Sequence, residues 1–229
     1  SGVLSFIAAP DFEAPADDDG DNVYHVIVRA GDGSLDDTQA IAVTVTDVSN
    51  VLIVTTAADD NDSGITTGAA YGAEWLNAHP GADGAISLRE AIIAANNSSG
   101  TTLIQFAIPG TGTHTITPGT ALPVITSPVV LDASTDDSFA ANGSRPAVVL
   151  DGLGMAANGI ELGAGADGSI IRGFVIRHFT DTGIVVAAHG VTIAGNYLGQ
   201  LDADGTASAA GTANGRFGLR VDAGVRDTV

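Results

Sequence analysis

Five polar residues in the second half of the sequence have side chains suited to acid–base chemistry. Asp132 and Asp151 each follow a Val-Val-Leu segment, and Arg177, His178 and Asp181 lie within one stretch of five residues. Cleavage of a polysaccharide needs a pair of acids at a fixed separation or a base beside a bound cation. These five residues are therefore the candidate catalytic set if the protein is a polysaccharide lyase or a glycoside hydrolase.

A structural role for these residues is the interpretation that the sequence favours. An Asp at the end of a strand commonly accepts hydrogen bonds from the backbone of its own turn. The chain has no Lys, which excludes a lysine base and a lysine clamp on a substrate. The five His residues show neither HxH nor HExxH spacing, so a metal site built on imidazole is not expected. We therefore predict a non-catalytic protein and keep the enzyme as the alternative.

Acidic residues dominate the charge of the chain. Among its 229 residues, 27 Asp and Glu stand against 8 Arg, which gives a net charge of −19. This charge repels nucleic acid and anionic lipid. The absence of Cys excludes disulfides, thiol nucleophiles and zinc ribbons. Every apolar run is far shorter than the roughly 20 residues that cross a bilayer. We expect neither nucleic-acid binding nor membrane insertion by this segment.

The acids are mostly Asp, and the chain has 30 Gly. Both residue types favour turns over helices, so this balance predicts an all-β protein. Asp-rich turns also offer the hard oxygen ligands that calcium prefers. One helix is nevertheless predicted at 88–96, because Ser87 and Glu90 form a capping box ahead of apolar residues at helical spacing.

Alternation of apolar and polar residues predicts two strands within 22–33 and 39–48, joined by a turn rich in Gly and Asp. A third strand is predicted at 51–54. The acidic cluster at 17–22 precedes the first strand. It has the Asp spacing of an EF-hand loop but lacks the bidentate Glu at the last position of that loop.

Short aliphatic segments alternate with Gly, Asn and Asp from about residue 103 onward. Residues 170–176 align with 192–198 at an offset of 22, and 130–132 align with 149–151 at an offset of 19. A repeat of this length with such short strands is typical of the stacked coils of a parallel β-solenoid.

Residues 1–50 resemble the C-terminal half of a cadherin-like repeat. The resemblance rests on an Asp-Phe-Glu segment, an NxYxVxVxAxDG strand and a closing VxVxD strand. In that family the corresponding acids bind calcium between successive repeats. The resemblance therefore implies calcium ligands at Asp11, Glu13, Asp32 and Asp47. Asn50 replaces the second linker acid of the family, which implies weak binding.

The rest of the chain resembles two patterns of bacterial secreted proteins. SLREAIIAAN at 87–96 is similar to the signature of the CSLREA domain, with Ile86 in place of the Cys. The segment 195–221 is similar to a repeat of right-handed β-helix proteins. The resemblance implies a cap segment at 51–102 followed by parallel β-helix coils at 103–229.

Together these observations predict an all-β protein, a right-handed parallel β-helix (solenoid) with one N-terminal capping helix. A partial cadherin-like β-sandwich precedes it in the prediction. The resemblances imply a fragment of a large bacterial extracellular adhesin or surface-scaffold protein, secreted and membrane-associated, which acts in calcium-dependent cell adhesion. Cell-surface glycans or further copies of the same protein are the expected partners.

Overall fold

The structure, a computed structural model, describes residues 4–7, 10, 12, 15–31, 34–45 and 50–229. The chain divides into two compact units, Ser1–Ser49 and Asn50–Val229. Each unit has its own secondary structure and is described by itself.

The first unit contains a β-hairpin. Strand β1 (Val23–Gly31) pairs antiparallel with β2 (Asp36–Thr44), in a register that places Val23 opposite Thr44. Large apolar side chains such as Ile27 and Leu35 remain exposed, because the described residues of this unit contain no second sheet to cover them. The predicted hairpin is confirmed, whereas the predicted partial β-sandwich is wrong for the described residues.

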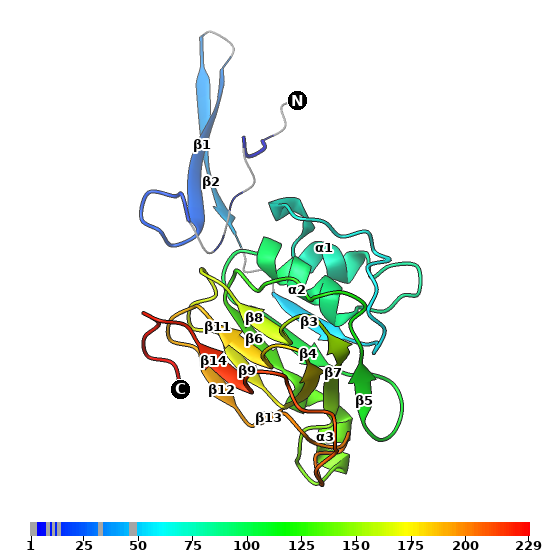
Figure 1. The fold of residues 1–229 in the computed structure, drawn as a ribbon. Coiled ribbons are helices and arrows are strands. Elements are labelled where there is room, and N and C mark those ends of the chain that lie inside the picture. Colours follow the sequence, from blue (N-terminus) through cyan, green and yellow to red (C-terminus); the bar gives the residue numbers. More distant parts are fainter. Residues whose placement is uncertain (1–3, 8–9, 11, 13–14, 32–33, 46–49) are drawn as a thin grey trace. The chain divides into compact units, whose positions relative to one another are not determined.

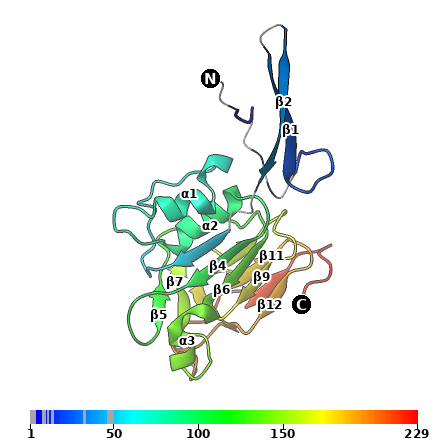
Figure 2. The same cartoon turned by 180° about the vertical axis from the view of Figure 1, so that it is seen from behind.

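The second unit contains three parallel sheets, which we call the first, second and third parallel sheets. The first has the order β12-β9-β6-β4-β3, the second β13-β10-β7-β5 and the third β14-β11-β8. Figure 2 shows β4, β6, β9 and β12 side by side. The strand bounds in chain order are β3 (Val51–Val54), β4 (Thr102–Phe106), β5 (His114–Ile116), β6 (Val129–Asp132), β7 (Val148–Met155), β8 (Ile160–Leu162), β9 (Ile170–Arg172), β10 (Phe174–Phe179), β11 (Ile184–Val186), β12 (Thr192–Ala194), β13 (Tyr197–Leu198) and β14 (Leu219–Val221).

From β7 onward the chain visits the second, third and first sheets in turn. Strand β9 pairs with β12 in a register that places Ile170 opposite Thr192, which matches the offset of 22 in the sequence. The alignment at an offset of 19 has no such counterpart, because β6 and β7 belong to different sheets. The inward-facing side chains of the sheets form one core, where Phe106 of β4 meets Phe174 of β10 edge to face.

Helices occupy three places in the second unit. They are α1 (Ala73–Ala78), α2 (Leu88–Asn97) and α3 (Asp137–Ala141), with two short 3₁₀ segments at Ala69–Tyr71 and Ala133–Thr135. Figure 1 shows α1 and α2 next to β3. The predicted helix at 88–96 is confirmed as α2, including its capping box. None of the described helices is long and apolar enough to span a membrane.

The predicted class, an all-β right-handed parallel β-helix with one capping helix, is wrong. The described residues are mixed, with 13% helix and 31% strand, and they combine parallel sheets with a separate antiparallel pair. An Asp-rich composition does not exclude helices, because Asp also caps helix N-termini. The Asp136 side chain accepts a hydrogen bond from the Ser138 N–H and so begins α3. Helix α1 follows Gly72 without any side-chain cap, so the sequence offered no comparable start signal there.

Candidate functional site

The four residues implied as cadherin-type calcium ligands, Asp11, Glu13, Asp32 and Asp47, lie outside the described residues. The calcium site of the first unit therefore stays a prediction. The candidate catalytic residues all lie in the second unit and are described.

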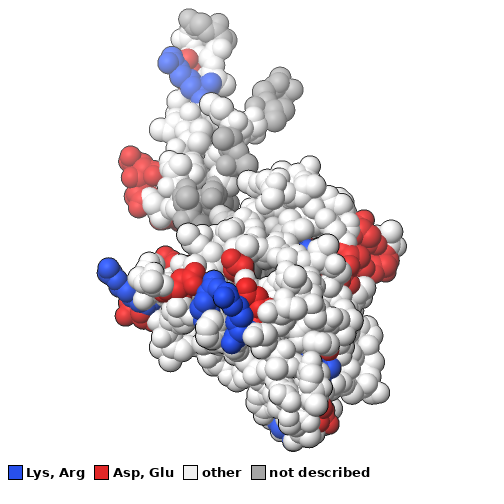
Figure 3. Space-filling model, in the orientation of Figure 1, with Lys and Arg blue, Asp and Glu red and all other residues white. Residues whose placement is uncertain are grey.

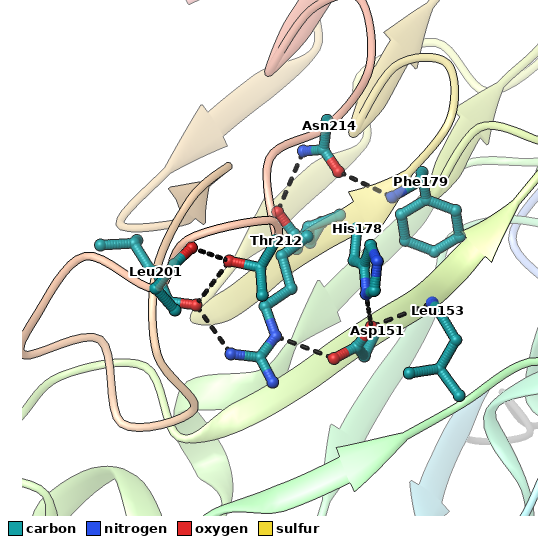
Figure 4. A network of polar contacts seen from close by, with 10 residues as sticks. Asp151, Leu153, His178, Phe179, Leu201, Thr212 and Asn214 are labelled. Atoms are coloured by element: carbon teal, nitrogen blue, oxygen red, sulfur yellow. Dashed lines mark hydrogen bonds and ion pairs between the residues drawn. The ribbon is translucent and has the colours of Figure 1, made fainter.

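Asp151 lies at the centre of a polar network between β7 and β10 (Figure 4). One carboxylate oxygen, Oδ2, accepts a hydrogen bond from Arg177 Nε at 2.9 Å. The other, Oδ1, accepts one from the Leu153 N–H at 3.0 Å and lies 3.3 Å from His178 Nδ1. The register of the two strands places Arg177 opposite Asp151. Both oxygens of this buried carboxylate are therefore already engaged.

The same network fastens the loop at 199–215 to β10. Arg177 donates to the carbonyl of Leu201 at 2.7 Å, and the His178 N–H donates to the carbonyl of Thr212 at 2.9 Å. The Asn214 side chain donates to a carbonyl of β10 and accepts an N–H from it. Figure 4 shows these groups converging from the loop onto the strand. These hydrogen bonds hold the loop against the sheet, so they support the fold.

Asp132 forms a second, separate ion pair at the end of β6. Its Oδ2 accepts from Arg172 of β9 at 2.5 Å, and its Oδ1 accepts from the N–H and the hydroxyl of Ser134. Burial alone would raise the pKa of Asp132, but the Arg172 and Ser134 donors hold the pKa below its usual range. This pair belongs to the first parallel sheet, whereas Asp151 belongs to the second.

Asp181 lies just beyond β10, where its carboxylate accepts from the Thr182 hydroxyl and is 3.9 Å from Arg216. The structure thus brings together three of the five candidate residues, Asp151, Arg177 and His178. The ion pairs of Asp132 and Asp181 are with other arginines, Arg172 and Arg216. The network holds one carboxylate, whereas glycoside hydrolysis uses a pair.

A different group of carboxylates gathers near α2. Oxygens of Asp60, Asp62 and Glu90 lie within 4.8 Å of one another. Glu90 is fully buried, and its two oxygens accept hydrogen bonds from the N–H groups of Ser63 and Ser87. We call these three residues the acidic triad. The sequence indicates a capping-box role for Glu90 and no metal site, although Asp-Asp-Asn-Asp at 59–62 contains the other two members of the triad.

Within the acidic triad, the negative charge of Asp60 has the fewest hydrogen-bond donors to stabilise it. Its Oδ1 is buried and has no hydrogen-bond partner. Burial raises the pKa of Asp60, and the negative charges of Glu90, Asp83 and Asp62 raise it further. Arg89, adjacent to Glu90 in the sequence, is committed to Asp59 in an ion pair. Figure 3 shows a patch of acidic atoms over the loops near α1.

Asp62 is held in place by the loop at 81–83. Its Oδ2 accepts from the N–H groups of Ala82 and Asp83 at 2.9 and 3.1 Å. A Cβ at Gly81, which has φ +96°, would lie 1.8 Å from Asp62 Oδ1, so only Gly fits there. The carboxylates of Asp62 and Glu90 are thus fixed by backbone donors, whereas Asp60 Oδ1 has no partner among the described residues. Oxygen ligands arranged in this way match the preference of calcium.

Two further groups of the described residues also place three ligand atoms within 4.8 Å. Asp17, Asp19 and Asp21 form one of them, in the acidic cluster noted in the sequence. The Asp17 carboxylate accepts from the Asp21 N–H, so it closes its own turn. His114, Asp136 and Asp137 form the other group, which the His spacing did not reveal.

Comparison of the chain with models of protein families, with curated proteins and with solved structures found no match. The cadherin-like and CSLREA resemblances therefore stay predictions.

Proposed function

We propose that this chain is a non-catalytic, calcium-stabilised segment of an extracellular adhesion or surface-scaffold protein. The observation that supports it is the division of the buried acids into two environments. Asp132 and Asp151 are each neutralised by an arginine on a neighbouring strand, whereas the acidic triad has no Arg among its hydrogen-bond partners in the described residues.

The first environment favours a scaffold over an enzyme. A carboxylate that accepts from an arginine and from its own turn has no free oxygen directed at a substrate. For Asp132, Arg172 also stabilises the ionised form, so this carboxyl is a poor general acid at neutral pH. The polar residues of these sheets hold strands and loops together.

The second environment favours a calcium ion. Calcium binds oxygens at about 2.3–2.6 Å, so two ligands of one ion lie at most about 5 Å apart. The oxygens of Asp60, Asp62 and Glu90 meet this condition. A divalent cation would supply the partner that Asp60 Oδ1 lacks and relieve the repulsion that raises its pKa.

Thermal unfolding with and without calcium tests the ion. We expect calcium to raise the melting temperature of the parent chain and of the control variant Asp227→Asn, an exposed acid outside the triad. The variants Asp60→Asn and Asp62→Asn should lose most of the rise. An equal rise in Asp60→Asn, or none in the parent at about 10 mM calcium, above the affinity range of extracellular modules, contradicts the proposal.

The adhesion function is tested with acidic and neutral polysaccharides and with immobilised copies of the chain. We expect retention on at least one of these surfaces in calcium and its loss on chelation, without new reducing ends or unsaturated products. Turnover of a polysaccharide that disappears in Asp151→Asn would establish the alternative, a polysaccharide lyase or glycoside hydrolase. Absence of retention on every surface would also count against adhesion.

A further inference from the structure

His114 is a buried histidine whose ring lacks the partner that burial requires. The residue begins β5 and is 8% exposed. Its Nε2 atom is buried and forms no hydrogen bond with any described residue. A buried polar atom without a partner loses its hydrogen bonds to water and gains none in the protein. Such an atom therefore needs an explanation.

The unpartnered nitrogen faces two carboxylates at the start of α3. Nε2 lies 3.6 Å from Asp136 Oδ1, whose side chain is fully buried. Asp137, the next residue, is exposed and completes a group in which the three ligand atoms lie within 4.8 Å of one another. The group therefore has a buried side, formed by His114 and Asp136, and a side open to solvent, formed by Asp137.

Asp136 is held by several donors. Its Oδ1 accepts from the N–H and the hydroxyl of Ser138, and its Oδ2 accepts from the Ile108 N–H at 2.8 Å. Hydrogen bonds of this kind orient the carboxylate ligands of metal sites. Gly110 leaves room beside the ring, since a Cβ there would approach His114 Cε1 to 3.3 Å.

We propose that His114, Asp136 and Asp137 bind a divalent transition-metal ion of the zinc type. Zinc bonds of about 2.0–2.2 Å in a tetrahedral arrangement separate two ligand atoms by roughly 3.4 Å, close to the 3.6 Å between Nε2 and Asp136 Oδ1. His nitrogen and Asp oxygen are both zinc ligands, and a site with three protein ligands leaves the fourth position for water. The imidazole distinguishes this site from the acidic triad, because calcium selects oxygen ligands.

A direct bond between His114 and Asp136 is the competing explanation. The distance of 3.6 Å exceeds the range of an N–H···O hydrogen bond. One metal ion bound to both His114 Nε2 and Asp136 Oδ1 gives the nitrogen a partner and fits the 3.6 Å between these atoms.

Calorimetric titration with zinc, in saturating calcium to occupy oxygen-only sites, tests the proposal. We expect one zinc ion per chain that requires His114. The variant His114→Gln should abolish this binding, and Asp137→Asn should weaken it at least about tenfold. Asp137 is exposed, so its replacement leaves the core intact. Binding should weaken in acid, because protons compete with the metal for the imidazole nitrogen.

Two controls separate this site from general attraction of zinc to an acidic chain. His25→Gln replaces an exposed histidine of β1 and should leave zinc binding unchanged. In nuclear magnetic resonance spectra, zinc should shift the Nε2 signal of the His114 ring more than that of any other histidine. Equal zinc affinity in His114→Gln, or no binding at about 1 mM zinc, a free energy of about −4 kcal/mol, overturns the proposal.

Discussion

Asp132 shows how a single residue keeps its charge inside this protein. The side chain is almost fully buried, yet its pKa stays low because Arg172 and Ser134 donate to it. Asp60 is the opposite case, since burial and neighbouring acids raise its pKa. These two residues give the stability of the second unit two pH dependences of opposite sign.

Replacement of Arg172 by Ala should raise the pKa of Asp132. A carboxyl whose pKa is lowered by folding stabilises the protein above its unfolded pKa, and this contribution is lost as the pH falls through the folded pKa. We therefore expect a loss of about 1 kcal/mol at pH 7, limited because Arg172 is half exposed, and a smaller loss in acid. Denaturant unfolding at several pH values measures it. Arg216→Ala, which removes an exposed pair at 3.9 Å, should change little.

Asp60→Asn should stabilise the chain in the absence of calcium. A carboxyl whose pKa is raised by folding destabilises the protein above the folded pKa, and this cost disappears as the pH falls to the unfolded value of 3.8. The melting temperature of the variant should therefore exceed that of the parent at neutral pH and equal it below pH 3.8. If the variant instead melts below the parent in calcium-free buffer at pH 7, other groups of the protein stabilise the negative charge of Asp60 and the prediction is wrong.

For helices and strands, the sequence predicts the features that depend on neighbouring residues or on a constant repeat. It does not predict contacts between residues far apart in the chain. The capping box of Ser87 and Glu90 located α2, and the repeat offset located the pairing of β9 with β12. Both signals lie in adjacent residues or in a constant spacing. The acidic triad joins Asp60 and Asp62 to Glu90, which lies 30 and 28 positions further along the chain, and no fixed motif spans that distance.

The same limit explains the outcome for the other candidate residues. Asp132 and Asp151 follow similar Val-Leu segments, and the sequence alone did not show that these segments enter different sheets. The sequence does not indicate a metal site at His114, because no second His lies at a metal-binding spacing. Its carboxylate partners begin a helix that composition did not predict.

Asn196 joins two successive turns of the chain. Its side chain accepts from the Phe174 N–H at 3.0 Å and donates to the Ile171 carbonyl at 2.7 Å. Asn196→Ala leaves both backbone groups without a partner, so we expect a loss of about 2 kcal/mol and a fall of several degrees in melting temperature. Asn196→Asp keeps the acceptor alone and should lie between the two. Equal stability of all three chains would mean that water replaces the amide.

For the whole molecule, charge and sheet edges have opposite effects on association. Among the described residues, β13 and β14 each have a neighbouring strand on one side only. Exposed apolar side chains, Phe217, Leu219 and Val221, lie in and next to β14. Free edges of this kind favour pairing between molecules. The net charge of −19 opposes such pairing through repulsion.

Removal of the charge should therefore allow the chains to associate. Light scattering should rise as the pH approaches the isoelectric point of about 4.1 and as salt screens the repulsion at neutral pH. The double variant Leu219→Lys and Val221→Lys, which places charges on an edge strand, should reduce the rise at neutral pH in high salt. Scattering that is independent of both pH and salt would exclude a role for charge.

Glu90 gives the second unit one further property, which concerns local opening. Its carboxylate holds the amide hydrogens of Ser63 and Ser87 at the same time, one in the loop after β3 and one at the start of α2. Neither amide can exchange its hydrogen for deuterium until its hydrogen bond to the Glu90 carboxylate breaks. The loop and the first turn of the helix should therefore open together as one unit. An ion bound to the acidic triad would slow deuterium uptake at both amides by a common factor, while the Leu153 amide, held by Asp151, would exchange at its former rate.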